Sequence, residues 1–411
     1  MSLLQNVKSG LCISCGMCTY LAPRKLVLKY NKHKGLYTPC LMDSLSDNEE
    51  YKIDNVCPAQ GYPIVSMGKQ LHNDVELYDY RIGYYYSFVA ARSLSDNIVR
   101  KASSGGIMTA LAYYMLSSGL VEGVIATKYL YDNNGGIIPK AIVATSLQEL
   151  LDCQGSKYMP VPIFDVLNTV KNYKRLAFIG TPCQIATLRR LQHLSSEYNN
   201  IIYTIGNFCG GYRDLRELSR LKKIAGFGKE PITHFQYRGD GQPGQMVIES
   251  RNKRWTYPYP KYSKLTGNIK YYRCRVCIDA TAELADVSCG DAWLPRFIQG
   301  SEKAWSIVII RNRELSKIME AMEANGLIKT EKILLDELIQ AQKQNIISKK
   351  ERFVSRIKFL RKIGKTNLPI YDGGYNPSQT TSVMFEAKVW FSQLYKVVLE
   401  RLGLYSYIIH Q

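Results

Sequence analysis

Four cysteines near the N-terminus constrain this chain of 411 residues more than any other feature. Three form a C-x2-C-x2-C run and the fourth lies directly before a proline; they are Cys12, Cys15, Cys18 and Cys57. Thiolates at such spacing hold either an iron–sulfur cluster or zinc. Zinc sites usually add a second cysteine pair or a histidine pair at short range, whereas His33 and His72 lie at no ligand spacing. The pattern therefore favours a 4Fe–4S cluster over zinc or no metal.

The same cysteines match one half of a two-cluster bacterial ferredoxin pattern. In such ferredoxins each run continues with x3-C-P, and the cysteine of that ending serves the other cluster. Here the first run continues to Ala22-Pro23, so its last cysteine is missing. The positions where a second run ending at Cys57 would need cysteines hold Asp47, Glu50 and Ile53. One ligand set is lost completely while the other is intact, which predicts a ferredoxin-like module over residues 1–70 with one cluster.

The charge of the chain points to an acidic partner. Lysine and arginine together number 54 against 35 aspartates and glutamates, which gives a formal net charge of +19. Bacterial ferredoxins are commonly acidic, so an acidic ferredoxin or a similar electron carrier is the expected partner. We find no helix-turn-helix, zinc-finger or RNA-binding signature, and we therefore expect no specific nucleic acid.

The cysteine usage and the N-terminal sequence predict a cytoplasmic protein. Residues 1–8 include no apolar core of the length that a signal peptide needs, and no apolar run approaches a membrane span. An odd count of 11 cysteines with C-x2-C spacing indicates metal-bound thiolates in a reducing compartment rather than disulfides. Cys40 belongs to no ligand pattern and is expected to be a small core residue.

Two C-terminal segments leave more than one interpretation open. Residues 343–365 are strongly basic and amphipathic, which fits either peripheral contact with anionic lipid or a helix packed on the domain with a solvated basic face. The second interpretation is favoured. Residues 382–404 are also amphipathic, and their aromatic side chains can dock on the protein itself, a membrane or a second subunit. These aromatic residues are Phe385, Trp390, Phe391 and Tyr395.

Alternating strand and helix patterns through the middle of the chain predict a mixed α/β domain. Strands are expected at residues 88–91, 121–127, 141–145, 176–179, 201–205, 234–238, 245–251, 286–289 and 306–311, and helices at 106–116 and 183–194. Cys183 and Cys209 then lie just beyond the carboxyl ends of two strands, where open parallel sheets bind cofactors. The expected organisation is a ferredoxin-like module (1–70), a mixed α/β flavin-binding domain (80–300) and a C-terminal helical tail (301–411).

Short blocks in an intact order from about residue 85 to 295 resemble the coenzyme F420 hydrogenase/dehydrogenase beta-subunit family. The most distinctive block is Gly180–Ile185, with the sequence GTPCQI. The other matching blocks are Ser103–Ala110, Val121–Ile125, Gly155–Tyr158, Asn207–Gly210, Tyr237–Gly239, Cys274–Asp279, Ala285–Asp286 and Gly290–Asp291. The chain after about residue 300 is poorly covered by this resemblance.

The resemblance implies that FAD and a second 4Fe–4S cluster lie close together. By position, the ligands of this flavin-proximal cluster are Cys183, Cys209, Cys274 and Cys277. Cys153 and Cys289 also lie near matching blocks, so either can replace one of the four. Members of the family reduce coenzyme F420 in hydrogenase and dehydrogenase complexes or reduce a hydroxymethyl chlorophyll with ferredoxin, and bacterial relatives are associated with surface polysaccharide biosynthesis.

Two of the family blocks are the expected flavin site. The residues assigned to it are Ser103, Ser104, Gly105, Gly106, Gly155, Ser156, Lys157 and Tyr158. Small residues before a helix let the backbone approach closely, and the helix-start N–H groups favour an anion such as the FAD pyrophosphate, although such a sequence is more often only a helix cap. Lys157 is expected to supply positive charge and Tyr158 to pack on the flavin ring; both also fit ordinary surface residues. A GxGxxG dinucleotide fingerprint is absent from the sequence.

These observations predict a ferredoxin-linked iron–sulfur flavoprotein oxidoreductase. Single electrons would pass through two 4Fe–4S clusters to FAD and on to a small organic substrate, with a role in surface polysaccharide biosynthesis. The alternative is an electron-transfer beta subunit of a larger hydrogenase or dehydrogenase complex that acts on coenzyme F420 or a similar carrier. A structural or nucleic-acid role fits the charge but leaves the SSGG and GTPCQ blocks unexplained. No catalytic acid or base is indicated.

Overall fold

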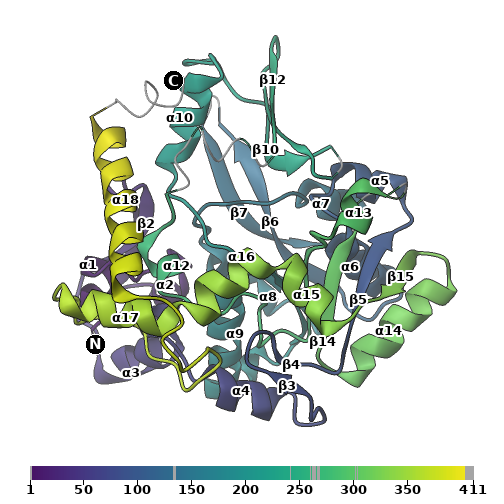
Figure 1. Ribbon diagram of the computed structural model, residues 1–411, viewed down its shortest axis with the longest axis horizontal. Helices are drawn as coiled ribbons and strands as arrows, with labels where there is room; N and C mark the ends of the chain where they lie inside the picture. The colour runs from purple at the N-terminus through teal and green to yellow at the C-terminus, as the bar shows by residue number, and fades with distance from the viewer. Residues whose placement is uncertain are drawn as a thin grey trace.

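The protein is a mixed α/β structure built on one large twisted sheet (Figure 1). The computed structural model describes residues 2–132, 136–240, 242–259, 261, 265, 269–300, 302 and 304–402. In the described residues the large sheet has eight strands in the order β15-β5-β14-β13-β9-β8-β6-β7. Their bounds are β5 (Ser87–Ser93), β6 (Gly123–Tyr131), β7 (Ile137–Ala144), β8 (Leu176–Gly180), β9 (Ile201–Asn207), β13 (Val287–Asp291), β14 (Ser306–Ile310) and β15 (Ile328–Lys332).

The centre of this sheet is parallel and its flanks are antiparallel. β6, β8, β9 and β13 run in the same direction, whereas β7, β14, β5 and β15 pair antiparallel to their neighbours. Strand β8 is apolar without alternation because both of its faces are covered. Ala177 contacts the core on one face, with Leu111 of α6 (Ile107–Ser117), and Phe178 contacts the core on the other, with Ile185 of α9 (Pro182–Leu194). The sheet therefore separates two hydrophobic cores.

The N-terminal segment is tied to the large core. Its elements are α1 (Leu3–Lys8), α2 (Met17–Leu21), β1 (Leu26–Asn31), β2 (Leu36–Leu41), α3 (Asp47–Val56) and α4 (Ile64–Leu71), with β1 and β2 paired antiparallel. Leu11, Met17 and Val56 belong to the same hydrophobic cluster as Phe178 and Val276. The N-terminal segment and the large α/β domain therefore share one hydrophobic core.

The described residues also form a smaller antiparallel sheet. It consists of β10 (His234–Gly239), β11 (Gln245–Glu249) and β12 (Arg254–Pro258), and α10 (Arg216–Ile224) packs on it. Strand β12 was not expected from the sequence. The remaining short elements are β3 (Tyr78–Asp79), β4 (Gly83–Tyr84), α5 (Asp96–Lys101), α7 (Leu147–Asp152), α8 (Leu167–Val170), α12 (Tyr272–Arg275), α13 (Pro295–Gln299) and α14 (Arg313–Ala324).

The chain after β15 is a helical extension, and it runs across the near face of the molecule in Figure 1. The helical tail was expected from residue 301, but β14 and β15 belong to the large sheet, so the C-terminal extension begins only with α15. It contains α15 (Leu335–Ala341), α16 (Lys343–Ile346), a π-helical turn (Ile347–Glu351), α17 (Phe353–Lys362) and α18 (Val383–Arg401). The expected solvated basic face is only partly correct. Lys358, Arg361 and Lys362 are exposed, but Lys349, Lys350 and Arg356 are buried because each finds polar or charged partners inside the protein.

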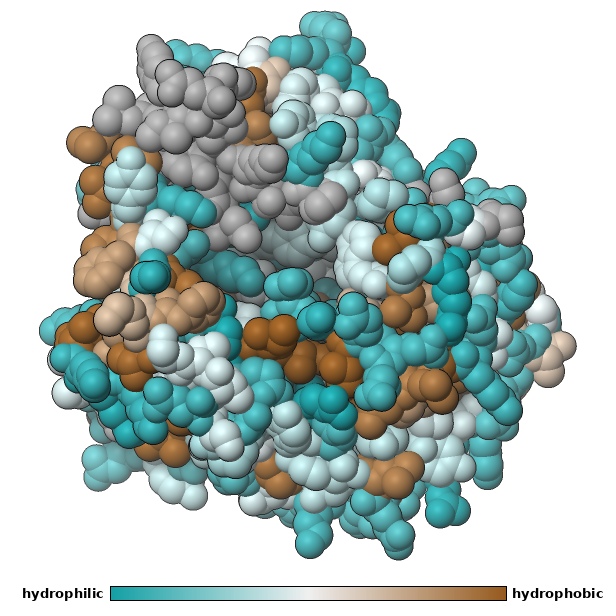
Figure 2. Space-filling view, viewed as in Figure 1, coloured by the Kyte–Doolittle hydropathy of each residue, from teal (hydrophilic) through white to brown (hydrophobic). Residues whose placement is uncertain are grey.

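Helix α18 presents apolar side chains on two sides. Trp390 packs on Tyr272 and Phe359, so one of the predicted docking aromatics contacts the protein itself. Phe391 and Tyr395 point outward and are each 60% exposed. Figure 2 shows apolar surface along this helix at the left of the molecule. In the part of the chain that the structure describes, no helix is both long and apolar enough to cross a membrane.

Candidate functional site

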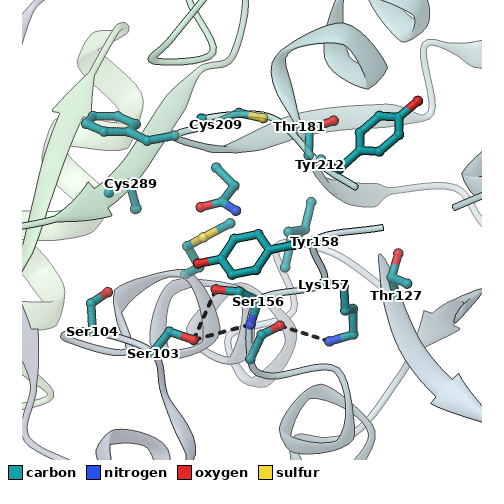
Figure 3. Close-up of a pocket in the computed structure, with 18 of the residues that line it drawn as sticks. Ser103, Ser104, Thr127, Ser156, Lys157, Tyr158, Thr181, Cys209, Tyr212 and Cys289 are labelled. Atoms are coloured by element: carbon teal, nitrogen blue, oxygen red, sulfur yellow. Dashed lines mark hydrogen bonds between the residues drawn. The ribbon is translucent and has the colours of Figure 1, made fainter. Parts of the chain in front are cut away.

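A cavity of about 420 Å³ opens where the parallel strands of the large sheet end. Its wall includes Gly180 and Thr181 after β8, Asn207 after β9, and the start of α6. This is the edge of an α/β sheet at which cofactors usually bind. Of the predicted flavin residues, those that line the cavity are Ser103, Ser104, Gly106, Gly155, Ser156, Lys157 and Tyr158. The two family blocks, about fifty residues apart in sequence, thus meet at one cavity (Figure 3).

Hydrogen bonds between the two blocks hold the serine loop in place. The Ser103 hydroxyl donates to the carbonyl oxygen of Arg238 at 3.1 Å and accepts from the Ser156 N–H at 3.2 Å. Ser104 and Ser306 hydroxyl oxygens are 2.9 Å apart. Gly105 does not line the cavity. It packs closely against neighbouring backbone, since a Cβ there would sit 2.5 Å from the carbonyl oxygen of Ala91. Its expected role in the flavin site is therefore indirect.

The start of α6 is suited to an anion. Gly106 caps this 11-residue helix with a φ of +74°, a left-handed conformation that residues with a side chain rarely adopt. Because glycine has no side chain, the first turn has no side-chain cap. The first-turn residues Ile107, Met108 and Thr109 line the cavity. Helix-start N–H groups and the positive end of the helix dipole favour negative charge there. A pyrophosphate group fits this arrangement.

Lys157 does not have the role that the sequence predicts for it. Its ammonium donates to three backbone carbonyl oxygens, those of Cys153, Gln154 and Gly155, at 2.7, 3.0 and 3.0 Å. Burial lowers the pKa of Lys157 to about 8. The charge is committed to the loop that follows α7, so Lys157 holds the loop that carries Gly155 and Ser156. Figure 3 shows its ammonium turned toward this loop.

Tyr158 lines the cavity, and its packing on a flavin ring stays a prediction. Figure 3 shows its ring between Ser103 and Ser156 on one side and Cys209 and Thr181 on the other. The ring packs on Tyr237, with centroids 5.2 Å apart. Tyr158 thus separates the serine side of the cavity from the cysteine side.

The four N-terminal cysteines line one narrow pocket, together with Asn6 and Ile53. Burial and the nearby Cys57 raise the pKa of the Cys12 thiol to about 12, and burial likewise raises the pKa values of Cys15, Cys18 and Cys57. Metal binding is what commonly converts such thiols to thiolates. Asn6 is 1% exposed, and neither atom of its amide has a hydrogen-bond partner among the described residues. A cluster with sulfur acceptors fits beside this amide.

The second cysteine set converges from three separate segments. Cys183 lies in the first turn of α9, Cys209 follows β9, and Cys274 and Cys277 lie within and just after α12. Burial and the thiol of Cys209 raise the pKa of Cys183 to about 12, and burial, Cys209 and Cys183 raise that of Cys274. Cys183 and Cys209 also line the cavity of the flavin blocks.

The two alternative ligands have other neighbours. Burial raises the pKa of Cys153 to about 11, and the charges that act most strongly on it are those of Lys157 and Lys128. Burial also raises the pKa of Cys289 to about 12, where Arg311 is the charged neighbour. In each quartet, by contrast, the charged neighbours that raise thiol pKa values include other cysteines of the same quartet. This favours the four predicted ligands of the second cluster over replacement by Cys153 or Cys289.

Within the described residues, no group of three or more His, Cys, Asp or Glu side chains is arranged to hold a single metal ion. A 4Fe–4S cluster makes a different demand, since each of its four thiolates binds a different iron. The buried, mutually interacting thiols and the unpaired Asn6 amide fit a cluster better than one ion.

Sequence reasoning missed the residues between the two quartets. Tyr212 and Tyr271 are stacked, with ring centroids 5.2 Å apart and planes at 14°. Burial raises the pKa of Tyr212 above its usual range, and Tyr271, Cys274, Cys183 and Cys12 raise it further. Both tyrosines are therefore close to thiols of both cysteine sets. The only sign of this pair in the sequence is the position of Tyr271, three residues before Cys274.

Arg273 also bridges the two sets. It is 1% exposed and donates to the carbonyl oxygen of Pro58 at 2.6 Å and to the Tyr371 hydroxyl at 3.0 Å. Its Nε and Nη1 atoms have no hydrogen-bond partner in the described part of the chain. Burial alone would lower the pKa of Arg273, but Tyr371, Cys277, Tyr62 and Cys183 raise it above its usual range.

Known proteins match the part of the chain that carries this site. Residues 88–168 match the model for the N-terminal part of the coenzyme F420 hydrogenase/dehydrogenase beta subunit, and residues 173–334 match the model for the C terminus of the same protein. The coenzyme F420 hydrogenase subunit beta of Methanococcus voltae is 28% identical over 263 residues, which cover 61% of this chain and 86% of that protein. The F420-dependent formate dehydrogenase subunit beta of Methanocaldococcus jannaschii is 28% identical over 286 residues, covering 68% and 69%.

Two further matches extend the comparison. The F420-dependent sulfite reductase of M. jannaschii is 25% identical over 348 residues, covering 80% of this chain but only 49% of that protein. A chain from the F420-reducing NiFe hydrogenase complex of Methanosarcina barkeri shares the fold, with a TM-score of 0.55 and 23% identity, covering 72% of this chain and 99% of that one. These relatives are oxidoreductases or their subunits, so the chain is of the oxidoreductase class. The two family models together span more than half of its length, and the chain belongs to the coenzyme F420 hydrogenase/dehydrogenase beta-subunit family.

Proposed function

We propose that this protein is the electron-transfer subunit of a larger oxidoreductase complex, and that it carries two 4Fe–4S clusters and one FAD. The observation that supports this most directly is that one cavity is lined both by the flavin blocks and by Cys183 and Cys209. A flavin in that cavity would lie beside the second cluster. Bound FAD supplies the conversion between single-electron transfer and the transfer of a hydride.

Different residues of the chain would bind the FAD and the two clusters. The first turn of α6 and the hydroxyl group of Ser104 would hold the pyrophosphate, and Tyr158 would pack on the ring. Cys12, Cys15, Cys18 and Cys57 would hold the first cluster, and Cys183, Cys209, Cys274 and Cys277 the second. The stacked pair of Tyr212 and Tyr271 would lie close to both clusters.

The acceptor or donor on the flavin side would be coenzyme F420 or a similar carrier. The relatives whose names mention F420 are a hydrogenase subunit, a formate dehydrogenase subunit and a sulfite reductase. They favour a subunit over the stand-alone enzyme of surface polysaccharide biosynthesis. The formal charge of +19 suits an acidic ferredoxin or another acidic electron-transfer partner at the first cluster.

The test is to purify the chain without oxygen and to count iron, sulfide and flavin. We expect about eight irons, four for each cluster, and about one FAD for each chain. Cys12→Ser and Cys183→Ser should each lose about half of the iron, because each removes a ligand of one cluster. Cys40→Ser is the matched control, since Cys40 lies outside both sets, and it should keep all the iron. About four irons in the wild-type protein would contradict the two-cluster proposal.

The carrier is tested separately with the reconstituted protein. Reduced protein is mixed with coenzyme F420, and the loss of the absorbance of the oxidised carrier is followed. Reduction in the wild-type protein but not in Cys183→Ser would support the proposal. A protein with full iron and flavin that reduces a free flavin but leaves F420 unchanged would contradict the choice of carrier.

A further inference from the structure

The C-terminal extension places a buried cation against the second cysteine set. Lys349 lies in the π-helical turn after α16 and is 4% exposed. Its Nζ is 3.7 Å from the sulfur of Cys277 and donates to the carbonyl oxygen of Asp279 at 2.6 Å. Among the described residues, no carboxylate forms an ion pair with it. A buried ammonium is costly without a compensating negative charge.

The next residue, Lys350, shows how a buried ammonium is usually compensated, namely by a carboxylate. Lys350 is fully buried and forms an ion pair with the carboxylate of Glu283, and it donates to the carbonyl oxygen of Gly374 at 2.6 Å. Within the described ranges, Lys349 has no such carboxylate partner. The side-chain atom that it contacts is instead the sulfur of Cys277, at 3.7 Å.

The electrostatics around Lys349 point the same way. Burial would lower its pKa, but the thiols of Cys277, Cys209 and Cys274, and then Asp279, raise it above the ordinary lysine range. The Lys349 ammonium thus faces the sulfurs of the second set rather than a paired carboxylate.

The segment that carries Lys349 is held firmly at several points. The Asp372 carboxylate accepts from the N–H groups of Val65 and Ser66 at 2.9 and 2.8 Å, at the start of α4. The Ile370 N–H donates to the carbonyl oxygen of Gln60 at 2.8 Å, and Asn367 donates to the Ser9 hydroxyl at 2.6 Å. The extension begins where the match to the family models ends, at residue 334, and it clamps the N-terminal segment onto the large domain.

We propose that Lys349 is the charge partner of the second 4Fe–4S cluster, and that the C-terminal extension delivers it there to raise the reduction potential of that cluster. Reduction adds one negative charge to a cluster, and a fixed cation nearby favours the reduced form. The inference rests on the proposed function, because it needs the second set to hold a cluster. Lys349 acts through the cluster and is a positioning residue, without contact to the substrate.

The test compares Lys349→Met and Lys349→Arg with the wild-type holoprotein. Met keeps most of the length and removes the charge, whereas Arg keeps the charge. The midpoint potentials of both clusters are measured by redox titration followed by electron paramagnetic resonance, and the signal lost in Cys183→Ser identifies the second cluster. Lys358→Met is the matched control, because Lys358 lies nearby on α17 but is exposed.

We expect Lys349→Met to weaken the reduction of the second cluster about tenfold, which is about 59 mV for a one-electron couple. The first cluster and the Lys358→Met protein should keep the wild-type potentials, and Lys349→Arg should restore most of the shift. Loss of the second cluster in Lys349→Met with retention in Lys349→Arg would also support a requirement for charge.

Two results would overturn the inference. One is an unchanged potential in Lys349→Met with full iron, and the other is equal loss of the cluster in both variants, which would assign Lys349 a packing role. Failure of the proposed function itself has a different signature. In that case the wild-type protein would hold only about four irons, or Cys183→Ser would leave its iron content unchanged.

Discussion

Arg273 donates a hydrogen bond of 2.6 Å to the carbonyl oxygen of Pro58, the residue that follows Cys57. Since Arg273 directly precedes Cys274, this one contact joins the peptide segments of the two cysteine sets. The same guanidinium reaches the Tyr371 hydroxyl of the C-terminal extension at 3.0 Å. Three parts of the chain that are distant in sequence thus meet at one buried cation.

Removing this cation should loosen all three parts. Arg273→Met leaves the Pro58 carbonyl and the Tyr371 hydroxyl without their donor, and hydrogen bonds to a charged group contribute about 1.5–3 kcal/mol each. We expect a loss of about 3 kcal/mol in unfolding free energy, measured by denaturant unfolding of the protein without its cofactors. Arg361→Met, an exposed position on α17, is the control and should change stability little. Equal stability of the two variants would show that the bridge does not stabilise the fold.

Gly106 should be required for flavin binding. Its φ of +74° disfavours any side chain, and a Cβ there would lie 2.7 Å from Cγ2 of Ile98. Gly119 is a matched control at the other end of α6, with a φ of +70° and open space around it. Both Gly106→Ala and Gly119→Ala carry the left-handed cost of about 1–2 kcal/mol, but only Gly106→Ala should displace the helix start. We expect flavin absorbance to fall in Gly106→Ala while the iron content stays full; comparable flavin loss in both variants would disprove a local effect.

His72 should make the protein sensitive to acid. The ring is 1% exposed, and burial together with the charge of Arg311 lowers its pKa from 6.5 to about 4. Between these two values the unfolded chain binds a proton that the folded protein excludes, so stability falls as the pH drops below 6.5. The contribution lost by pH 5 is about 2 kcal/mol.

The measurement compares unfolding free energies at pH 7 and pH 5. His72→Gln removes the titrating group while keeping an amide that can replace the contact to the Glu283 carbonyl oxygen, 3.2 Å from the His72 Nε2. Its stability should therefore depend less on pH than that of the wild-type protein. His193→Gln, at an exposed position, should retain the full dependence. The same pH dependence in all three proteins would assign the acid sensitivity to other groups.

Glu386 should fasten α18 to α17. Its carboxylate is 3% exposed and accepts from Arg352 at 2.6 Å and from Arg356 at 3.2 Å. Removing one partner of a buried pair costs about 3–5 kcal/mol because the remaining charge is left uncompensated. We expect Glu386→Ala to release α18, so that limited proteolysis cuts within residues 377–402 much faster than in the wild-type protein.

An exposed ion pair provides the comparison for Glu386. Glu331 pairs with Arg296 at 3.0 Å, and both side chains are 43% exposed. Such a pair is worth about 0–1 kcal/mol, so Glu331→Ala should leave the proteolysis pattern unchanged. Cleavage of α18 at the same rate in both variants would argue against a specific role for Glu386.

The sequence predicted those features that depend on local pattern. The apolar run at Leu176–Gly180 and the helix after Thr181 form as expected, because burial on both faces and a helix start leave clear signals. The blocks around Ser103 and Gly155 meet at one cavity with Cys183, which the family resemblance anticipated. The strand and the helix depend only on short stretches of chain, whereas the meeting of the distant blocks was expected from the family resemblance alone.

What escaped prediction depends on contacts between distant segments. Lys157 looked available for a ligand, but its charge is taken by three carbonyl groups of a loop. Lys349 looked like an ordinary member of the basic segment 343–365, and no sequence pattern singled out Arg273. Only the packing of the extension and of Pro58 shows that both are buried. Strand β12 escaped notice because its exposed and half-buried residues leave a weak pattern.

Residues 343–376 hold the N-terminal segment on the large domain, so an intact cofactor site depends on them as well as on the thiols. All eight cysteines of the two sets lie before residue 278, so a chain that stopped at residue 342 would still contain every thiol ligand. It would lack Lys349, Tyr371 and Asp372, and with them the cation beside Cys277 and the anchor at the start of α4. For this chain, the presence of all eight thiols is therefore not enough for intact cofactor sites; residues 343–376 must be present as well.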